Sequence, residues 1–211
     1  MSHPTLKLTY WDMPGGRGEP ARLALVVGGV PFEDHRVSFA DWPKFRGDAP
    51  FHACPYLEVN GTKLSQSNSI TRYVGRLAGL YPEDAWQAAL CDEMLDAVED
   101  MWVFFGATMG IEDPGALKIA RDNLVQNRYH HYLAQMGERL KDAGGEFFAD
   151  QRLTIADLQV LTICRALGSG QFDHIPKDLV KKTAPNVHDH MKRVLAVPKI
   201  TDYYAKMLAE S

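Results

Sequence analysis

Residues 54–73 read Cys54-Pro-Tyr-Leu-Glu-Val-Asn-Gly-Thr-Lys-Leu-Ser-Gln-Ser-Asn-Ser-Ile-Thr-Arg-Tyr73 and carry the clearest structural signals in the chain. Two β-prone runs, residues 56–59 and 62–65, are separated by Asn60-Gly61. This pair favours a tight hairpin turn because both residues tolerate positive φ. The stretch therefore predicts two antiparallel strands.

A helix is predicted to begin directly after this hairpin. Serine, glutamine and asparagine side chains over residues 65–69 are candidate caps, and apolar residues follow at helical spacing from Ile70 to Leu77. Free N–H groups at a helix N-terminus, together with the Gln66 amide and the Ser67 hydroxyl, suit a carboxylate or a phosphate. The segment is thus a candidate anion site, although an ordinary capped helix explains the same local pattern.

Pro55 stands just before the first strand of the hairpin. Proline has no N–H for a sheet ladder, so Pro55 either begins an edge or follows a cis peptide bond. A cis bond would leave the backbone N–H and C=O of Cys54 free for a ligand.

Composition excludes several classes of protein. The chain has 211 residues, 24% of them charged and 45% hydrophobic, which is typical of a globular protein with one or two cores. A net charge of −4 without clustered Lys and Arg argues against nucleic-acid or anionic-membrane partners.

Three widely spaced cysteines favour free thiols in a reducing, cytoplasmic compartment. No leader-like or membrane-length apolar run is present, so we expect neither export nor membrane spanning.

The residues before the hairpin predict a β–α–β unit. Residues 6–10 alternate in polarity as a strand does, residues 17–27 form a helix with Pro20 in its first turn, and residues 32–37 form a second strand. The two strands should be parallel because a helix connects them. With the hairpin and its helix this is a thioredoxin-like order, but no Cys-x-x-Cys follows the first strand, so thiol–disulfide exchange is excluded.

After a linker at residues 79–84 the strand signals stop. Apolar residues recur every three or four positions from Trp86 to Phe105, and again from Pro114 to Leu140. Thr154-Ile-Ala-Asp157 resembles a capping box, and the helix after it is apolar nearly all round, which predicts burial. We therefore predict an α/β thioredoxin-like domain over residues 1–79 and an all-helical domain over residues 84–211.

The motif Pro-x-Leu-x-x-Asn-Gly followed by Leu-x-Gln-Ser-x-x-Ile-x-x-Tyr resembles the glutathione-binding segment of cytosolic glutathione transferases, and the two-domain order resembles that family over the whole chain. Further motifs resemble its sigma class, the class of the haematopoietic prostaglandin D synthases. They are Leu-Thr-Tyr10, Arg17-x-Glu19, Asp34-His-Arg36, Ala40-Asp-Trp-Pro43 and Thr154-x-Ala-Asp157. The resemblance implies conjugation of glutathione to small hydrophobic electrophiles, a detoxification reaction.

The resemblance makes Tyr10 and Arg17 the expected catalytic residues. A cysteine thiol has a pKa of about 8.5, so a neutral tyrosine hydroxyl that donates a hydrogen bond to sulfur would favour the reactive thiolate. Lowering the thiol pKa by about two units corresponds to roughly 2.7 kcal/mol. One charge-assisted hydrogen bond, at about 1.5–3 kcal/mol, supplies most of that. The simpler alternatives are a buried Tyr10 at the end of a strand and a solvated Arg17.

The family pattern also assigns a binding site for glutathione, the co-substrate. Gln66 and Ser67 should take the γ-glutamyl carboxylate, and the backbone near Cys54 should pair with the peptide. Trp42 and Arg46 should hold the glycine end, with Arg46 in place of the family's frequent lysine. The expected glutathione-binding set is Tyr10, Trp11, Arg17, Trp42, Arg46, Ala53, Cys54, Pro55, Gln66, Ser67 and Asp100.

By resemblance, Asp100 reaches the ammonium group of glutathione in the other subunit of a homodimer, whereas Glu99 is an ordinary exposed acid. The electrophile should lie between the domains against aromatic and methionine side chains, which make a deformable apolar wall. A stripe of such residues is also typical of plain core. The expected lining residues are Trp11, Met13, Met101, Phe105, Met109 and Leu208.

Two departures from the prostaglandin synthase pattern bear on the substrate. Ala107 stands where that enzyme carries a pocket tryptophan, and the loop at residues 14–16 has one extra residue. Alternative functions are therefore a glutathione-dependent isomerase of prostanoid or lipid peroxides and a non-catalytic relative of the S-crystallin kind. Retention of the polar set that includes Tyr10, Gln66 and Asp100 argues against the second.

Other candidate sites are weaker. His130-His131 and His188-x-His190 lack metal-ligand spacing and are interpreted as histidines on helix surfaces, so no metal is expected. Cys54 lies outside the Tyr10 region where a catalytic thiol would be placed, so a backbone role is favoured. Gly15, Gly16 and Gly18 do not match a dinucleotide fingerprint.

Overall fold

The computed structural model describes residues 4–210, and the chain forms two compact units. The first unit contains the residues up to Pro82 together with those from Ala196 onward, and the second contains Glu83–Leu195. The sequence placed the C-terminal helix in the second domain. In the structure this helix, α10 (Pro198–Glu210), packs against α1 (Glu19–Gly28) of the first unit.

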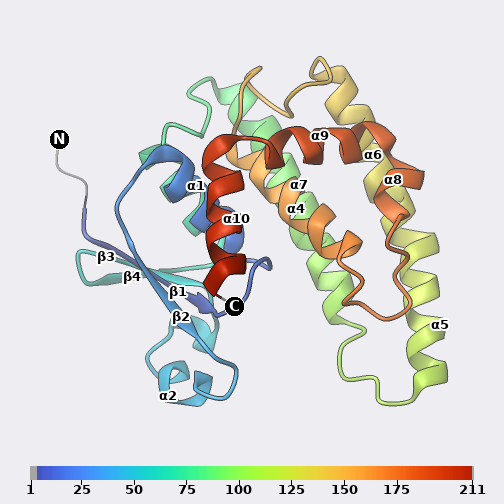
Figure 1. The fold of residues 1–211 in the computed structure, drawn as a ribbon, viewed down its shortest axis with the longest axis horizontal. Coiled ribbons are helices and arrows are strands. Elements are labelled where there is room, and N and C mark those ends of the chain that lie inside the picture. Colours follow the sequence, from blue (N-terminus) through green and yellow to red (C-terminus); the bar gives the residue numbers. More distant parts are fainter. Residues whose placement is uncertain (1–3, 211) are drawn as a thin grey trace. The chain divides into compact units, whose positions relative to one another are not determined.

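The first unit is a thioredoxin-like sheet with helices, as predicted (Figure 1). Besides α1 and α10, its elements are β1 (Leu6–Trp11), β2 (Glu33–Val37), α2 (Trp42–Arg46), η1 (Pro50–His52), β3 (Tyr56–Val59), β4 (Thr62–Ser65) and α3 (Ser67–Leu77). The strands are in the order β2-β1-β3-β4, with β1 parallel to β2 and the other pairs antiparallel.

The hairpin forms as the Asn-Gly pair predicts. Asn60 has φ 49° and Gly61 has φ 84°, and Val59 pairs with Thr62 across the turn. The Cys54–Pro55 peptide bond is cis, so the second of the two alternatives for Pro55 is the one observed. The predicted side-chain cap at the start of α3 is wrong at its N-cap residue, since Gln66 makes no capping hydrogen bond with its side chain.

The second unit is helical throughout (Figure 1). Its elements are α4 (Ala85–Gly106), α5 (Pro114–Leu124), η2 (Val125–Tyr129), α6 (His130–Asp142), α7 (Ile155–Gly168), α8 (Leu179–Thr183) and α9 (Pro185–Leu195). The single helix expected from Pro114 to Leu140 is continuous but contains the π-helical turn η2, where Tyr129 donates a hydrogen bond to the Met101 carbonyl at 3.1 Å. Of the helices in residues 4–210, none is both long and apolar enough to cross a membrane.

The predicted capping box at α7 is confirmed, and Asp157 does more than cap the helix. Its carboxylate accepts hydrogen bonds from the Thr154 N–H at 2.7 Å and the Thr154 hydroxyl at 2.9 Å. It also contacts the Phe148 N–H at 3.1 Å and His190 Nε2 at 2.8 Å. His190 is completely buried, so its interpretation as a surface histidine is wrong. Four donors therefore converge on one buried carboxylate.

We expect Asp157→Ala to lower the free energy of unfolding by about 3–4 kcal/mol, because buried donors would lose their acceptor at once. Urea unfolding followed by circular dichroism measures this change. Asp142→Ala, which removes a carboxylate whose side chain is 68% exposed, is the matched control and should cost less than about 1 kcal/mol. Equal small losses in both variants would show that the Asp157 cluster is not a major source of stability.

Candidate active site

Tyr10 lies near the end of β1, and strand pairing brings two other chain segments, the one before β3 and the one after β4, to the same end of the sheet. Thr9 pairs with Tyr56 in β3, which brings Pro55 beside Tyr10, and Tyr56 pairs in turn with Ser65, the residue before Gln66. The C-terminal ends of β1 and β4 and the N-terminal end of β3 therefore lie at one edge of the sheet. Strand pairing therefore brings Tyr10, Pro55 and Gln66 to the same end of the sheet.

The ring of Tyr10 is 5% exposed and packs against two glycines of the loop after β1. A Cβ atom on Gly18 would lie 2.4 Å from the ring atom Cγ, and one on Gly16 would lie 2.4 Å from the phenolic oxygen. Both distances are far below contact distance, so any side chain at these positions would displace the ring. The two glycines thus allow Tyr10 to occupy this place.

The hydroxyl of Tyr10 accepts a hydrogen bond from the backbone N–H of Arg17 at 2.9 Å. Burial raises the pKa of Tyr10 to about 12, although the Arg17 N–H opposes that rise. The phenol is therefore neutral near pH 7 and keeps its own hydrogen for donation. Because an N–H bond to the oxygen polarises the O–H group, this arrangement makes Tyr10 a better donor.

Arg22 holds the loop that surrounds Tyr10. Its guanidinium group is completely buried, lies 5.4 Å from the centre of the Tyr10 ring, and donates to the carbonyls of Trp11 at 3.0 Å and Met13 at 3.3 Å. Two carboxylates balance its charge, Asp34 at 2.8 Å and Glu19 at 3.5 Å. Sequence reasoning missed Arg22, yet a signal was present, because it is the one basic residue in the otherwise largely apolar helix α1.

The carboxylates around Arg22 extend this network to the C-terminal helix. Arg36 on β2 pairs with Asp34 at 2.8 Å and donates to the Tyr203 hydroxyl at 3.1 Å. Tyr203 in turn donates to Glu19 at 3.2 Å. Burial raises the pKa of the Glu19 carboxyl, and Arg22 opposes this. Glu19, Asp34 and Arg36, which come from the motifs at residues 17–19 and 34–36, are therefore parts of one partly buried network.

Aromatic side chains lie next to Tyr10. The Trp11 ring is 6.2 Å from the Tyr10 ring, 5.1 Å from Trp42 and 4.5 Å from Phe39, measured between centroids. Phe39 is 69% exposed, so this cluster offers apolar surface to a ligand. Met13, in the loop that follows β1, is half-buried.

The remaining predicted residues of the first unit occupy turns and helix ends. Gln66 has φ 72° and ψ 116°, a strained conformation for a residue with a side chain, and Ser67 is the first residue of α3. Arg46 ends α2 and is exposed, and Ala53 is extended just before Cys54. Burial raises the pKa of the Cys54 thiol to about 12, so this thiol remains protonated and is a poor nucleophile.

The predicted residues of the second unit differ in their accessibility. Asp100 is exposed on α4, and its carboxylate accepts a hydrogen bond from the Tyr132 hydroxyl at 2.9 Å. Met101 has no exposed surface and Phe105 is 7% exposed, whereas Met109 is 64% exposed. Leu208, which belongs to the first unit, is 79% exposed on α10.

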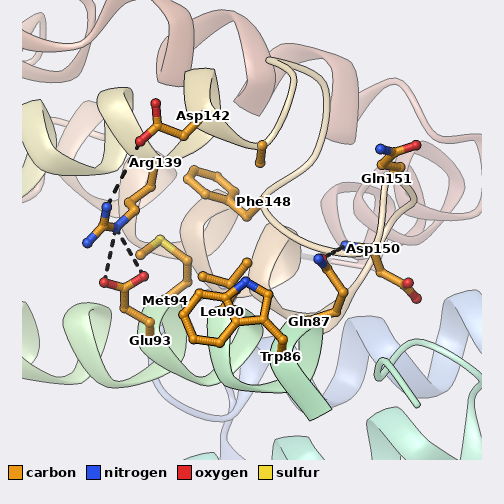
Figure 2. Close-up of a pocket in the computed structure, with 11 residues that line it drawn as sticks. Trp86, Gln87, Leu90, Glu93, Met94, Arg139, Asp142, Phe148, Asp150 and Gln151 are labelled. Carbon is orange, nitrogen blue, oxygen red and sulfur yellow. Dashed lines mark hydrogen bonds and ion pairs between the residues drawn. The ribbon is translucent and has the colours of Figure 1, made fainter. Parts of the chain in front are cut away.

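A cavity of about 400 Å³ lies in the second unit, and none of the predicted site residues lines it. Figure 2 shows Phe148, Leu90, Met94 and Trp86 around it, with Arg139 between Glu93 and Asp142 on one side. Arg139 contacts both carboxylate oxygens of Glu93, at 3.0 and 3.1 Å. The charged groups on this side are therefore already paired with one another.

The histidines do not gather with other metal ligands. His130 Nδ1 contacts the Thr183 hydroxyl at 2.9 Å, and His190 contacts Asp157 as described above. Across residues 4–210, no group of three or more His, Cys, Asp or Glu side chains is arranged to hold a metal ion.

Comparison with known proteins identifies the family to which the chain is similar. Residues 6–76 match the family model "Glutathione S-transferase, N-terminal domain", and residues 100–207 match "Glutathione S-transferase, C-terminal domain". Glutathione S-transferase 2 of Manduca sexta is 31% identical over 192 residues, covering 89% of this chain and 90% of the relative. Glutathione S-transferase 1 of Ascaris suum is 37% identical over 161 residues, covering 74% and 77%.

A solved structure gives the same result over nearly the full length. The structure described as prostaglandin synthase D of Nilaparvata lugens superposes with a TM-score of 0.86 at 29% identity, covering 96% of this chain and 98% of the other. The chain belongs to the glutathione S-transferase family, as the matches to both of its domain models show.

The packing of Tyr10 against Gly18 leads to a test. We expect Gly18→Ala to lower kcat/KM for glutathione conjugation by about tenfold or more, because the new methyl group must displace the ring and its hydroxyl. Gly18 has φ −86°, so the substitution adds no backbone penalty. Gly47→Ala is the matched control, since Gly47 has φ −62° and no atom within 4 Å of its added Cβ. Wild-type turnover by a folded Gly18→Ala protein would contradict the positioning of Tyr10.

Proposed function

We propose that this chain transfers the glutathione thiolate to small apolar electrophiles, and that Tyr10 stabilises the thiolate by hydrogen bonding. The observation that carries the proposal is the geometry of the phenol. Its oxygen accepts the Arg17 N–H at 2.9 Å, its pKa is raised by burial, and its hydrogen is left to donate. A neutral donor of this kind favours the anionic form of a thiol and thereby increases the nucleophile concentration near pH 7.

The remaining site residues are proposed to bind glutathione. The strained Gln66 and the first N–H groups of α3 suit the γ-glutamyl carboxylate, because a helix N-terminus attracts an anion. The backbone of Cys54, beside the cis bond, suits the peptide part of glutathione. Trp42 and Arg46, at the two ends of α2, suit the glycine carboxylate. Arg17 assists the sulfur through the backbone contact with Tyr10 and through its positive charge.

Within the first unit, Trp11 and Met13 are the residues proposed to contact the electrophile. Within the second unit, Phe105 and Met109 are the residues proposed to do so. Exposed aromatic and methionine surface at Phe39 and Met109 supports this, because flexible apolar side chains accommodate varied substrates. Met101 has no exposed surface, so its contribution would be to pack behind Phe105.

A sigma-like, cytoplasmic homodimer is the proposed form of the protein. In this form Asp100, held by the Tyr132 hydroxyl, reaches the glutathione ammonium of the partner subunit. A second candidate activity is isomerisation of a prostanoid or lipid peroxide, which is favoured by the likeness to a protein described as a prostaglandin synthase. Ala107, in place of a pocket tryptophan, argues against it.

Removing the Tyr10 hydroxyl tests the proposed mechanism. We expect Tyr10→Phe to bind glutathione but to lose about ten- to thousandfold in kcat/KM with an aryl halide, corresponding to a lost bond of about 1.5–4 kcal/mol. Tyr129→Phe, which removes another buried hydroxyl, should leave kcat/KM within about threefold. Unchanged turnover in Tyr10→Phe would exclude Tyr10 as the activating group.

The role of Asp100 is tested by removing its charge while keeping an acceptor for Tyr132. We expect Asp100→Asn to raise the KM for glutathione by about three- to tenfold while the protein still elutes as a dimer on size exclusion. Glu99→Gln serves as the neighbouring control and should leave the KM unchanged. A monomer, or an unchanged KM in Asp100→Asn, would show that Asp100 does not contact glutathione across the interface.

A further inference from the structure

Arg121 on α5 is a buried cation that the proposed mechanism does not use. It is 5% exposed, and its guanidinium group lies 4.1 Å from the centre of the Phe105 ring. Its Nε donates to the Thr108 hydroxyl, and one terminal nitrogen donates to the Asp173 carbonyl at 3.2 Å. The other terminal nitrogen has only the Met109 sulfur, at 4.0 Å. All of these acceptors are neutral.

The acceptors around Arg121 differ from those around Arg22. Arg22 is also buried, and two carboxylates lie within 3.5 Å of it. Among the described residues, no carboxylate lies within ion-pair distance of Arg121. A buried charge with no carboxylate at ion-pair distance is costly. Burial accordingly lowers the pKa of Arg121, and the electrostatic effects of Tyr129 and Asp173 oppose this lowering only in part. An anion brought to Arg121 would relieve that cost.

We propose that Arg121 is an anion-recognition residue that selects electrophiles carrying a carboxylate. The proposal rests on the proposed transferase function, because Phe105 and Met109, the residues that cover Arg121, are those expected to contact the electrophile. An apolar carbon chain or ring would lie on Phe105 and Met109 while the carboxylate meets the guanidinium.

Met109 gives the carboxylate a route to Arg121. It is 64% exposed and makes only a weak contact with the guanidinium through its sulfur. Methionine has three rotatable bonds and changes conformation at low cost, so it can move aside and leave two N–H donors facing the ligand. The guanidinium lies over the Phe105 ring, and this ring is held in turn by its contacts with Trp102 and Phe172.

This site is separate from the cavity in Figure 2. That cavity contacts α4 between Trp86 and Met94, whereas Arg121 contacts the end of α4 at Phe105 and the residues after it. Phe105 follows Met94 by eleven positions in α4, which corresponds to a helical rise of about 16 Å. The arginine of that cavity, Arg139, is paired with Glu93 and 48% exposed, so it provides a matched control.

The test compares two aryl chlorides that differ in one charge, 4-chloro-3-nitrobenzoate and its methyl ester. In each reaction the thiolate sulfur forms a bond to the carbon that bears chlorine, and chloride leaves with the bonding electron pair. The quantity measured is the ratio of kcat/KM for the benzoate to that for the ester, so differences in chemical reactivity cancel between variants.

We expect Arg121→Met to lower this ratio tenfold or more while turnover of the ester stays within about threefold of wild type. Arg139→Met should leave the ratio unchanged. An unchanged ratio in an active Arg121→Met protein, or an equal loss for both substrates, would overturn the role of Arg121. Failure of the wild type to conjugate either substrate would instead contradict the proposed transferase function.

A measurement on the wild type keeps the inference testable if Arg121→Met does not fold. A saturated ten-carbon carboxylate and the alcohol of equal length are compared as inhibitors of ester turnover. We expect the carboxylate to inhibit at a concentration at least tenfold lower than the alcohol. Equal inhibition would show that no cation recognises the carboxylate.

Discussion

The hydrogen bond from the Arg17 N–H to the Tyr10 oxygen is the interaction on which the rest of the first unit depends. It requires the loop after β1 to fold back over the ring, which is possible only because Gly16 and Gly18 have no side chains there. Arg22 fixes the same loop through two backbone carbonyls, and its charge is balanced by Glu19 and Asp34. Ion pairs around the buried Arg22 thus position a neutral hydroxyl. The glycines allow the loop to cover the Tyr10 ring, and the covered phenol keeps its proton because burial raises its pKa.

Much of the fold follows from local patterns in the sequence. The Asn60-Gly61 turn, the β–α–β unit and the capping box at Thr154 were predicted because each depends on residues close together in the chain. Features that depend on distant residues were not. The burial of His190 results from a carboxylate 33 residues away, and the docking of α10 depends on Arg36, which is 167 residues from Tyr203. The role of Arg22 was not predicted either, because the sequence alone does not show that Arg22 lies on the buried face of α1.

The two units contain buried charges of two kinds. In the first unit Arg22 meets carboxylates, and in the second Asp157 meets four donors, so both charges are satisfied by the chain itself. Arg121 has neutral acceptors only, and its neighbours Phe105 and Met109 are apolar. Arg22 and Asp157 therefore stabilise the fold. The Tyr10 hydroxyl and the Arg121 guanidinium, in contrast, can each donate a further hydrogen bond. We propose that these two groups contact the substrates. Polar groups whose partners all lie within the chain are thus assigned to stability, and polar groups with a free donor are assigned to substrate binding.

We propose that a phenol which keeps its own proton, Tyr10, favours the thiolate form of bound glutathione. The most direct measurement is the ultraviolet absorbance of the thiolate in the complex of wild-type protein with glutathione, followed from pH 5 to pH 10. A hydrogen bond to sulfur favours the anion, so the thiol pKa must fall and the absorbance must appear at lower pH than in free glutathione. We expect a midpoint about two units below the ordinary thiol value of about 8.5. A midpoint at or above 8.5, with glutathione bound, would contradict thiolate stabilisation by Tyr10.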